Sequence, residues 1–113
     1  TPESKVNAII RAGLAAAGDH STTITNVMTG RPARGVVNRA MRELGPVAAE
    51  HPGFPHTAAG FGPLKAAAEK LGQADFTNVW AGQAVAFGRE APAGELTREL
   101  AAAAQQRLRA LAG

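Results

Sequence analysis

Two stretches of the sequence combine residue types that commonly bind ligands. In the first, from Thr29 to Asn38, two arginines, Arg31 and Arg34, stand beside a predicted helix start. The free backbone N–H groups and the dipole of a helix N-terminus favour an anion, and guanidinium groups add to that preference. The stretch therefore predicts binding of a phosphate or a carboxylate. An exposed basic first turn that binds no ligand is the alternative.

The second stretch, from Trp80 to Gln83, contains the single tryptophan of the chain. Gly82 removes side-chain bulk near the indole, and the Gln83 amide can both donate and accept hydrogen bonds. An aromatic ring with an open neighbour and an amide suits the wall of a site for an aromatic ligand. Packing of Trp80 in a hydrophobic core is the alternative.

The remaining polar residues form no recognisable catalytic or metal-binding pattern. His51 and His56 are separated by two prolines, so they do not share a helix face, and no second pair of ligands completes a tetrahedral set. The serines and glycines match neither a nucleophile elbow nor a nucleotide-binding loop. We therefore predict no catalytic residue and no metal ligand in this chain.

The composition limits the chain to one small domain with a thin core. Of its 113 residues 45% are hydrophobic, but 26 residues are alanines. Twelve Lys and Arg against nine Asp and Glu give a net charge of +3, too small an excess to predict nucleic-acid binding. The residues predict neither disulfides nor thiolate chemistry, and neither a signal peptide nor a membrane span. We expect a cytoplasmic protein with no nucleic-acid or membrane partner.

The spacing of apolar, proline and glycine residues predicts a fold that is mainly α with one short strand. A helix capped by Thr1 is expected to end at Gly18, and β-branched residues predict a strand over 22–28. Further helices are expected over 32–44, over 63–71, around Trp80, Ala84 and Phe87, and over 92–112, with a long loop over 46–62.

The single predicted strand has no predicted partner. Its backbone N–H and C=O groups need hydrogen bonds, so we expect this segment either to pair with something outside these 113 residues or to be only loosely extended.

The two ligand-binding stretches also carry a family resemblance. Thr29 to Asn38 resembles the T/S-G-R-P-A-R-G-x-x-N signature of the nitronate monooxygenases, formerly called 2-nitropropane dioxygenases. Asp75 and Phe76, followed by Trp80 to Gln83, resemble the D-F-x-x-x-W-A/S-G-Q stretch of the same family. With the opening Thr1-Pro2-Glu3-Ser4 and the amphipathic last helix, the resemblance covers nearly the whole chain and matches the C-terminal part of the family.

The resemblance implies a piece of an FMN-dependent (β/α)₈ TIM-barrel enzyme that oxidises alkyl nitronates with O₂. Residues 1–18 would follow the last barrel strand, 19–90 would form a mostly helical cap over the active site, and 91–113 would be the last barrel helix. The missing upstream barrel portion would be the partner of this chain, would bind most of the FMN and would supply the catalytic base. The chain alone is then expected to be inactive.

Within that family, the two stretches become candidates for specific roles. Trp80, Gly82 and Gln83 would border the cavity for flavin or substrate. Arg31, Arg34 and Asn38 would bind the anionic nitronate or orient the cap on the barrel. For these residues the alternative is that both stretches only join the cap to the barrel. Two alternatives for the whole chain also stay open: a free-standing helical binding module with a basic anion-binding turn, and a related barrel flavin oxidoreductase such as an enoyl reductase.

Overall fold

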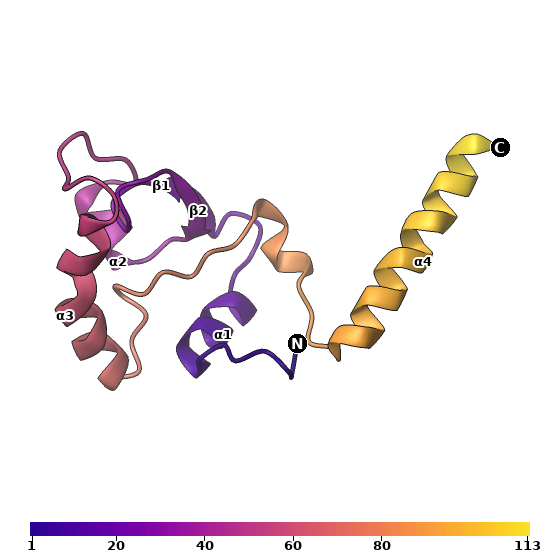
Figure 1. Ribbon diagram of the computed structural model, residues 1–113, viewed down its shortest axis with the longest axis horizontal. Helices are drawn as coiled ribbons and strands as arrows, with labels where there is room; N and C mark the ends of the chain where they lie inside the picture. The colour runs from indigo at the N-terminus through magenta and orange to yellow at the C-terminus, as the bar shows by residue number, and fades with distance from the viewer. The chain divides into compact units, whose positions relative to one another are not determined.

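Two structural units divide the chain. The computed structural model describes all 113 residues; residues 6–88 form one unit, and residues 1–5 with 89–113 form the other. The helices and strands of the first unit, shown in Figure 1, are α1 (Ala8–Ala15), β1 (Thr22–Thr25), β2 (Ala33–Val36), α2 (Arg39–Leu44), α3 (His56–Lys70) and the 3₁₀ helix η1 (Gln83–Phe87). The second unit contains α4 (Ala93–Ala112).

The sheet of the first unit has two strands, so the prediction of one strand with an outside partner was wrong. β1 and β2 pair antiparallel, with Thr22 opposite Val36 and Thr25 opposite Ala33. The predicted helix over 32–44 therefore begins only at Arg39. The helical pattern of its apolar residues misled because Val36 and Val37 also suit an extended strand, and Val37 N–H bonds the Ser21 carbonyl 2.8 Å away.

The turn between the two strands depends on Gly30. Its φ of +87° lies in the left-handed region, and its N–H bonds the Asn26 carbonyl at 2.8 Å. A Cβ on this residue would lie 2.7 Å from the backbone nitrogen of Phe54. Glycine is therefore required here both for the backbone conformation and for the close approach of the 52–54 segment.

The hydrophobic core lies where α2 meets the segment after β1. Val27, Met28, Ala40 and Met41 are buried and form its centre. Four partly buried residues pack around them: Val37, Ala48, Phe61 and Phe76. The Phe61 and Phe76 rings stack with centroids 6.2 Å apart, so α3 and the segment after it are attached to the same core.

Asn38 holds three parts of this core together. Its Oδ1 accepts a hydrogen bond from Met41 N at 3.0 Å and so caps α2. Its Nδ2 donates to the Thr77 carbonyl at 3.2 Å and contacts the Met28 sulfur at 3.6 Å. Because the side chain is buried, all of these contacts are protected from water.

α3 begins seven residues earlier than predicted and contains Pro63. The predicted loop over 46–62 therefore ends at Pro55, and His56 is the first residue of the helix. A proline normally excludes the helical conformation from the preceding residue, because its ring meets that residue's Cβ. Gly62 has no Cβ, which removes this clash, although Pro63 still lacks the N–H that would bond the Ala59 carbonyl.

The first helix is also shorter than predicted. α1 starts at Ala8 and ends at Ala15, and Asn7 caps it by accepting from Ile10 N at 2.8 Å. The predicted cap at Thr1 was wrong because residues 1–6 are not helical. The cap at Asn7 lies directly before the half-buried apolar residues Ile9, Ile10 and Leu14.

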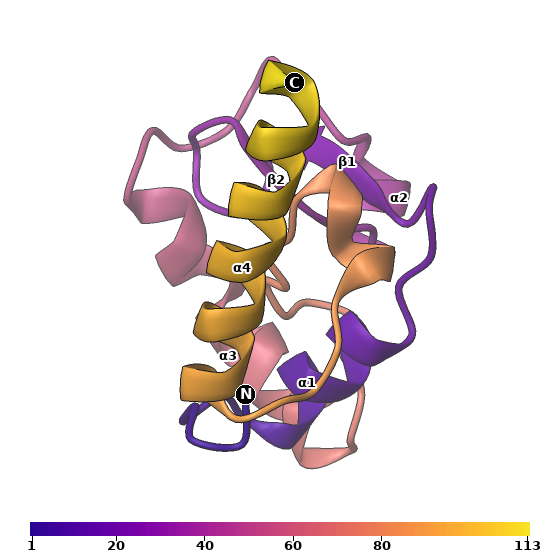
Figure 2. The same cartoon turned by 90° about the vertical axis from the view of Figure 1, so that its right-hand side faces the viewer.

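The second unit confirms the predicted last helix, α4, which is the orange-to-yellow helix in Figure 2. It starts one residue after Pro92. Both carboxylate oxygens of Glu3 accept from Ala93 N, at 3.0 and 3.2 Å, so an acidic residue lies at the positive end of α4. Hydrogen bonds from the N–H groups of Glu3 itself and of Ala93 lower the pKa of the Glu3 carboxyl. The contact therefore favours the folded unit at neutral pH and weakens as the pH falls through that lowered value.

No helix combines the length and the apolar composition that crossing a bilayer requires. The cytoplasmic location stays a prediction.

We expect Asn38→Ala to destabilise the protein by about 2 kcal/mol, because it removes a helix cap and leaves the buried Thr77 carbonyl unpaired. Chemical denaturation measures the effect. Asn78→Ala is the matched control, since this half-buried amide makes no side-chain hydrogen bond. Equal losses of stability in the two variants would contradict the role of Asn38.

We expect Gly30→Ala to cost roughly 2 kcal/mol or more, from left-handed strain plus the clash with Phe54 N. Gly72→Ala separates the two causes. Gly72 also has a positive φ, +72°, but a Cβ there meets nothing within 4 Å. Its cost should be about 1 kcal/mol in the same denaturation experiment. A Gly72 variant as unstable as the Gly30 variant would show that the close approach contributes nothing.

Candidate functional site

The two stretches identified in the sequence lie side by side in the structure. β2, which belongs to the first stretch, bonds the segment that begins the second: Val36 N donates to the Val79 carbonyl at 2.8 Å, and Ala81 N donates to the Arg34 carbonyl at 3.2 Å. Gly35 and Trp80 form an antiparallel bridge between these two bonds. Residues 34–36 and 79–81 therefore form a single surface, although the two segments are more than forty residues apart in sequence.

Trp80 lies in this extended segment, so the predicted helix carrying Trp80, Ala84 and Phe87 was wrong. The η1 helix begins three residues later, at Gln83. The indole lies against Gly35, and 41% of the residue is exposed. Trp80 is therefore not part of the hydrophobic core of this unit.

Gly82 and Gln83 follow Trp80 on the open side of the surface. Both residues are exposed, and a Cβ on Gly82 would meet no atom within 4 Å. Gly82 precedes η1 in an extended conformation, with φ −76° and ψ 174°. The segment therefore offers open space beside the indole and an amide at the start of the 3₁₀ helix.

The two arginines lie in different surroundings, and neither flanks a helix N-terminus as predicted. Arg34 belongs to β2, and its Nη1 donates to the Thr22 carbonyl at 3.1 Å and to Thr22 Oγ1 at 3.3 Å. The Arg31 guanidinium lies over the Phe54 ring, 4.4 Å from its centroid. The Arg34 side chain is thus hydrogen-bonded to β1. The Arg31 guanidinium is exposed above the Phe54 ring, and its N–H groups are available to bind another partner.

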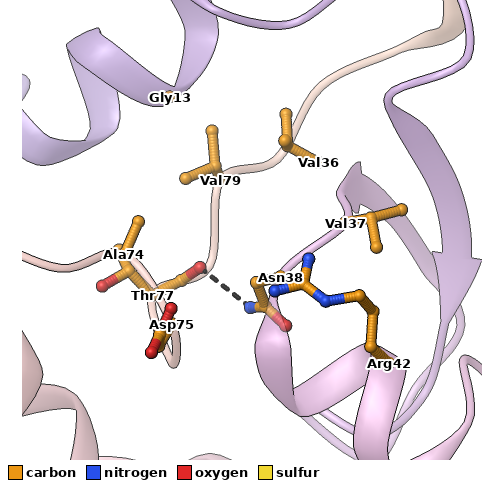
Figure 3. A pocket seen from close by; sticks show the side chains of 9 residues that line it. All are labelled: Gly13, Val36, Val37, Asn38, Arg42, Ala74, Asp75, Thr77 and Val79. Carbon is orange, nitrogen blue, oxygen red and sulfur yellow. Dashed lines mark hydrogen bonds between the residues drawn. The ribbon is translucent and has the colours of Figure 1, made fainter.

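A pocket of about 130 Å³ lies next to Asn38. Figure 3 shows the side chains that line it. Its apolar wall is made by Gly13, Val36, Val37, Ala74 and Val79, and its polar lining by Asn38, Arg42, Asp75 and Thr77. Of the six site candidates only Asn38 reaches it. The Asn38 amide is already bonded to Thr77 and Met41, so it supports the wall rather than offering a free group.

Sequence reasoning missed the partners that position the candidates. Gly35 contacts Trp80, Phe54 contacts Arg31 and Thr22 contacts Arg34, and each pair is separated by at least twelve residues. Nothing in local spacing identifies such pairs. The antiparallel pairing of β1 with β2 would have been the signal for the Thr22 contact, had the second strand been recognised.

Comparison with known proteins connects this surface to a family. A sequence model described as nitronate monooxygenase matches residues 1–103. A nitronate monooxygenase of Pseudomonas aeruginosa is 39% identical over 100 residues, covering 88% of this chain and 28% of that protein. A probable nitronate monooxygenase of Staphylococcus saprophyticus is 30% identical over 81 residues, covering 72% of this chain and 23% of that protein.

A solved structure agrees with the sequence comparison. The nitroalkane oxidase from Streptomyces ansochromogenes superimposes with a TM-score of 0.80 at 38% sequence identity, covering 96% of this chain and 31% of that chain. The chain thus spans between 23% and 31% of the length of these three proteins. Since the family match extends over most of its residues, the chain belongs to the nitronate monooxygenase family, a family of oxidoreductases.

Proposed function

We propose that this chain is the C-terminal portion of an FMN-dependent nitronate monooxygenase that oxidises alkyl nitronates with O₂. In this proposal residues 19–90 cap the mouth of a (β/α)₈ barrel that the upstream portion of the protein forms, residues 1–18 follow its last strand, and residues 91–113 are its last helix. The catalytic base and the phosphate site of the cofactor lie in that upstream portion. The chain alone is inactive because it lacks both.

The observation that carries the proposal is the meeting of the two family motifs on one surface. The bonds from Val36 to Val79 and from Ala81 to Arg34 make one surface out of the motifs on which the resemblance depends. Family membership over residues 1–103 supports an enzyme rather than a free-standing module.

The residues of this surface fit the ring of a flavin better than its phosphate. The partly exposed Trp80 indole and the open space at Gly82 suit a flat aromatic group. When bound, FMN supplies the redox chemistry that amino-acid side chains lack. Trp80, Gly82 and Gln83 are proposed to border the ring or the adjacent substrate, and to exclude water from it.

Arg31 is the better candidate of the two arginines for attracting the nitronate anion. It is exposed and retains its donors above the Phe54 ring, whereas Arg34 already binds Thr22. We propose that Arg34 and Asn38 instead maintain the shape of the cap against the barrel.

The apolar face of α4 is proposed to pack on the wall of the barrel. No residue of α4 is buried in this structure, and its exposed leucines include Leu100 at 63%, Leu108 at 67% and Leu111 at 85%. These residues recur on one side of the helix together with Leu96. An exposed stripe of this kind marks a contact surface, and the upstream portion of the protein is the proposed occupant.

We expect Trp80→Ala in the full-length protein to lower kcat/KM for an alkyl nitronate about tenfold or more. The kcat/KM of Trp80→Phe should lie between those of the wild type and of Trp80→Ala. Steady-state O₂ consumption measures this, with flavin absorbance and circular dichroism as controls for loading and folding. Leu71→Ala truncates another exposed apolar side chain, outside both motifs, and should leave the rate unchanged.

Unchanged kinetics in a folded, flavin-loaded Trp80→Ala protein would show that Trp80 does not border the flavin or the substrate. A wild-type protein that reduces an enoyl thioester and ignores nitronates would instead assign a related flavin reaction. A full-length protein that purifies without flavin would favour the binding module.

We expect Leu108→Asp to destabilise the full-length protein by about 2–3 kcal/mol, because a charge would replace a leucine buried against the barrel. Gln106→Asp on the opposite side of α4 is the matched control and should change stability little. Thermal unfolding of both variants measures the difference. Similar midpoints in the two variants would show that the leucine face is not covered.

A further inference from the structure

Gly35 is the residue on which the Trp80 indole lies. It is buried in β2, and a Cβ built on it would be 3.0 Å from Trp80 Cε3 and 3.3 Å from Cζ3. The same Cβ would be 3.0 Å from the Val79 carbonyl oxygen. The space that a side chain would occupy at this strand position is therefore filled by the indole.

Backbone hydrogen bonds on both sides of Trp80 hold its segment against β2, so the segment cannot move away from Gly35 without breaking them. The hydrogen bonds from Val36 to Val79, at 2.8 Å, and from Ala81 to Arg34, at 3.2 Å, lie on either side of the Gly35–Trp80 pair. In antiparallel pairing this pattern brings the two Cα atoms closest together and their side chains onto one face. Thr23 of β1 stands opposite Gly35 on the other edge of the strand. The indole therefore lies against the central strand of a surface made of β1, β2 and residues 79–81.

One side of the indole contacts the strand, and the side chain remains 41% exposed. Gly82, two residues after Trp80, is surrounded by open space, since a Cβ there would meet no atom within 4 Å. A tryptophan that served only as core would be enclosed on both sides, and a flexible surface tryptophan would not be held between two backbone hydrogen bonds.

We infer that Gly35 is a positioning residue for the reaction: it sets the plane in which Trp80 presents its free side to the bound flavin or substrate. This inference rests on the proposed function. A methyl group at position 35 tilts or lifts the indole, because the Val79 carbonyl on the other side belongs to the backbone and cannot yield as a side chain does.

The experiment uses the full-length protein labelled with 5-fluorotryptophan, in which the resonance lost in Trp80→Phe identifies Trp80. In Gly35→Ala we expect that resonance to shift by more than its linewidth, and kcat/KM for an alkyl nitronate to fall roughly tenfold. In the Trp80→Ala background, Gly35→Ala should change kcat/KM less than about twofold, because the group through which it acts is gone. Gly60→Ala on α3 is the matched control, since its Cβ meets nothing within 4 Å, and it should change neither quantity.

Three results would overturn the inference: an unmoved Trp80 resonance in Gly35→Ala, an equal kinetic loss in both backgrounds, or a shift of the resonance with no kinetic loss although Trp80→Ala is impaired. If neither Gly35→Ala nor Trp80→Ala alters the kinetics while the resonance shifts, the indole is positioned but the proposed cavity role fails.

A failure of Gly35→Ala to fold is also informative. If Gly35→Ala combined with Trp80→Ala restores folding, the clash is with the indole and the inference is supported. If the double variant also fails to fold, the Val79 carbonyl is the obstacle and Gly35 serves the backbone alone.

Discussion

Strand β2 is the constraint on which the first unit depends, because both of its edges are used. On one edge it pairs with β1, and on the other it bonds the segment from Val79 to Ala81. A strand with both edges occupied cannot slip in register without breaking two sets of bonds. Only four residues long, β2 therefore fixes where Arg34, Gly35 and Trp80 stand relative to one another. The surface carrying the family motifs is a product of this double pairing.

Local signals predicted the parts of the fold that depend on local interactions. The last helix follows from its own leucine spacing and its acidic start, and it was confirmed as Ala93–Ala112. β2 could not be predicted in this way, because Ala33 and Gly35 are poor strand formers and the segments that pair with the strand are distant in sequence, at Thr22–Thr25 and at Val79–Ala81. The same holds for α3, where Gly62 permits a helix that Pro63 alone argues against. The candidate site residues could be proposed from the sequence, but the residues that contact them, such as Gly35 beneath Trp80, required the structure.

The small core of this unit is consistent with a chain that belongs to a larger protein. Its buried centre holds two methionines, a valine and an alanine, and alanines elsewhere contribute little area. Polar contacts make up part of the difference: Asn38 joins three segments, and Thr77, fully buried, donates to Glu69 Oε1 at 2.8 Å. Such contacts specify geometry more than they add stability. That balance suits a surface whose task is to present a few side chains in fixed positions.

The bond between Glu3 and Ala93 joins residues ninety positions apart in the sequence. Residues 1–5 and 89–113 form one unit, so the intervening residues 6–88 leave it and return to it at neighbouring points. In topological terms, residues 6–88 are an insertion in the unit formed by residues 1–5 and 89–113, whose two segments contact each other through Glu3 and Ala93. An insertion of this kind can lengthen, shorten or be exchanged during evolution without breaking the continuity of its host. Under the proposed function, changes in residues 6–88 would alter substrate preference while the contact between Glu3 and Ala93 is kept.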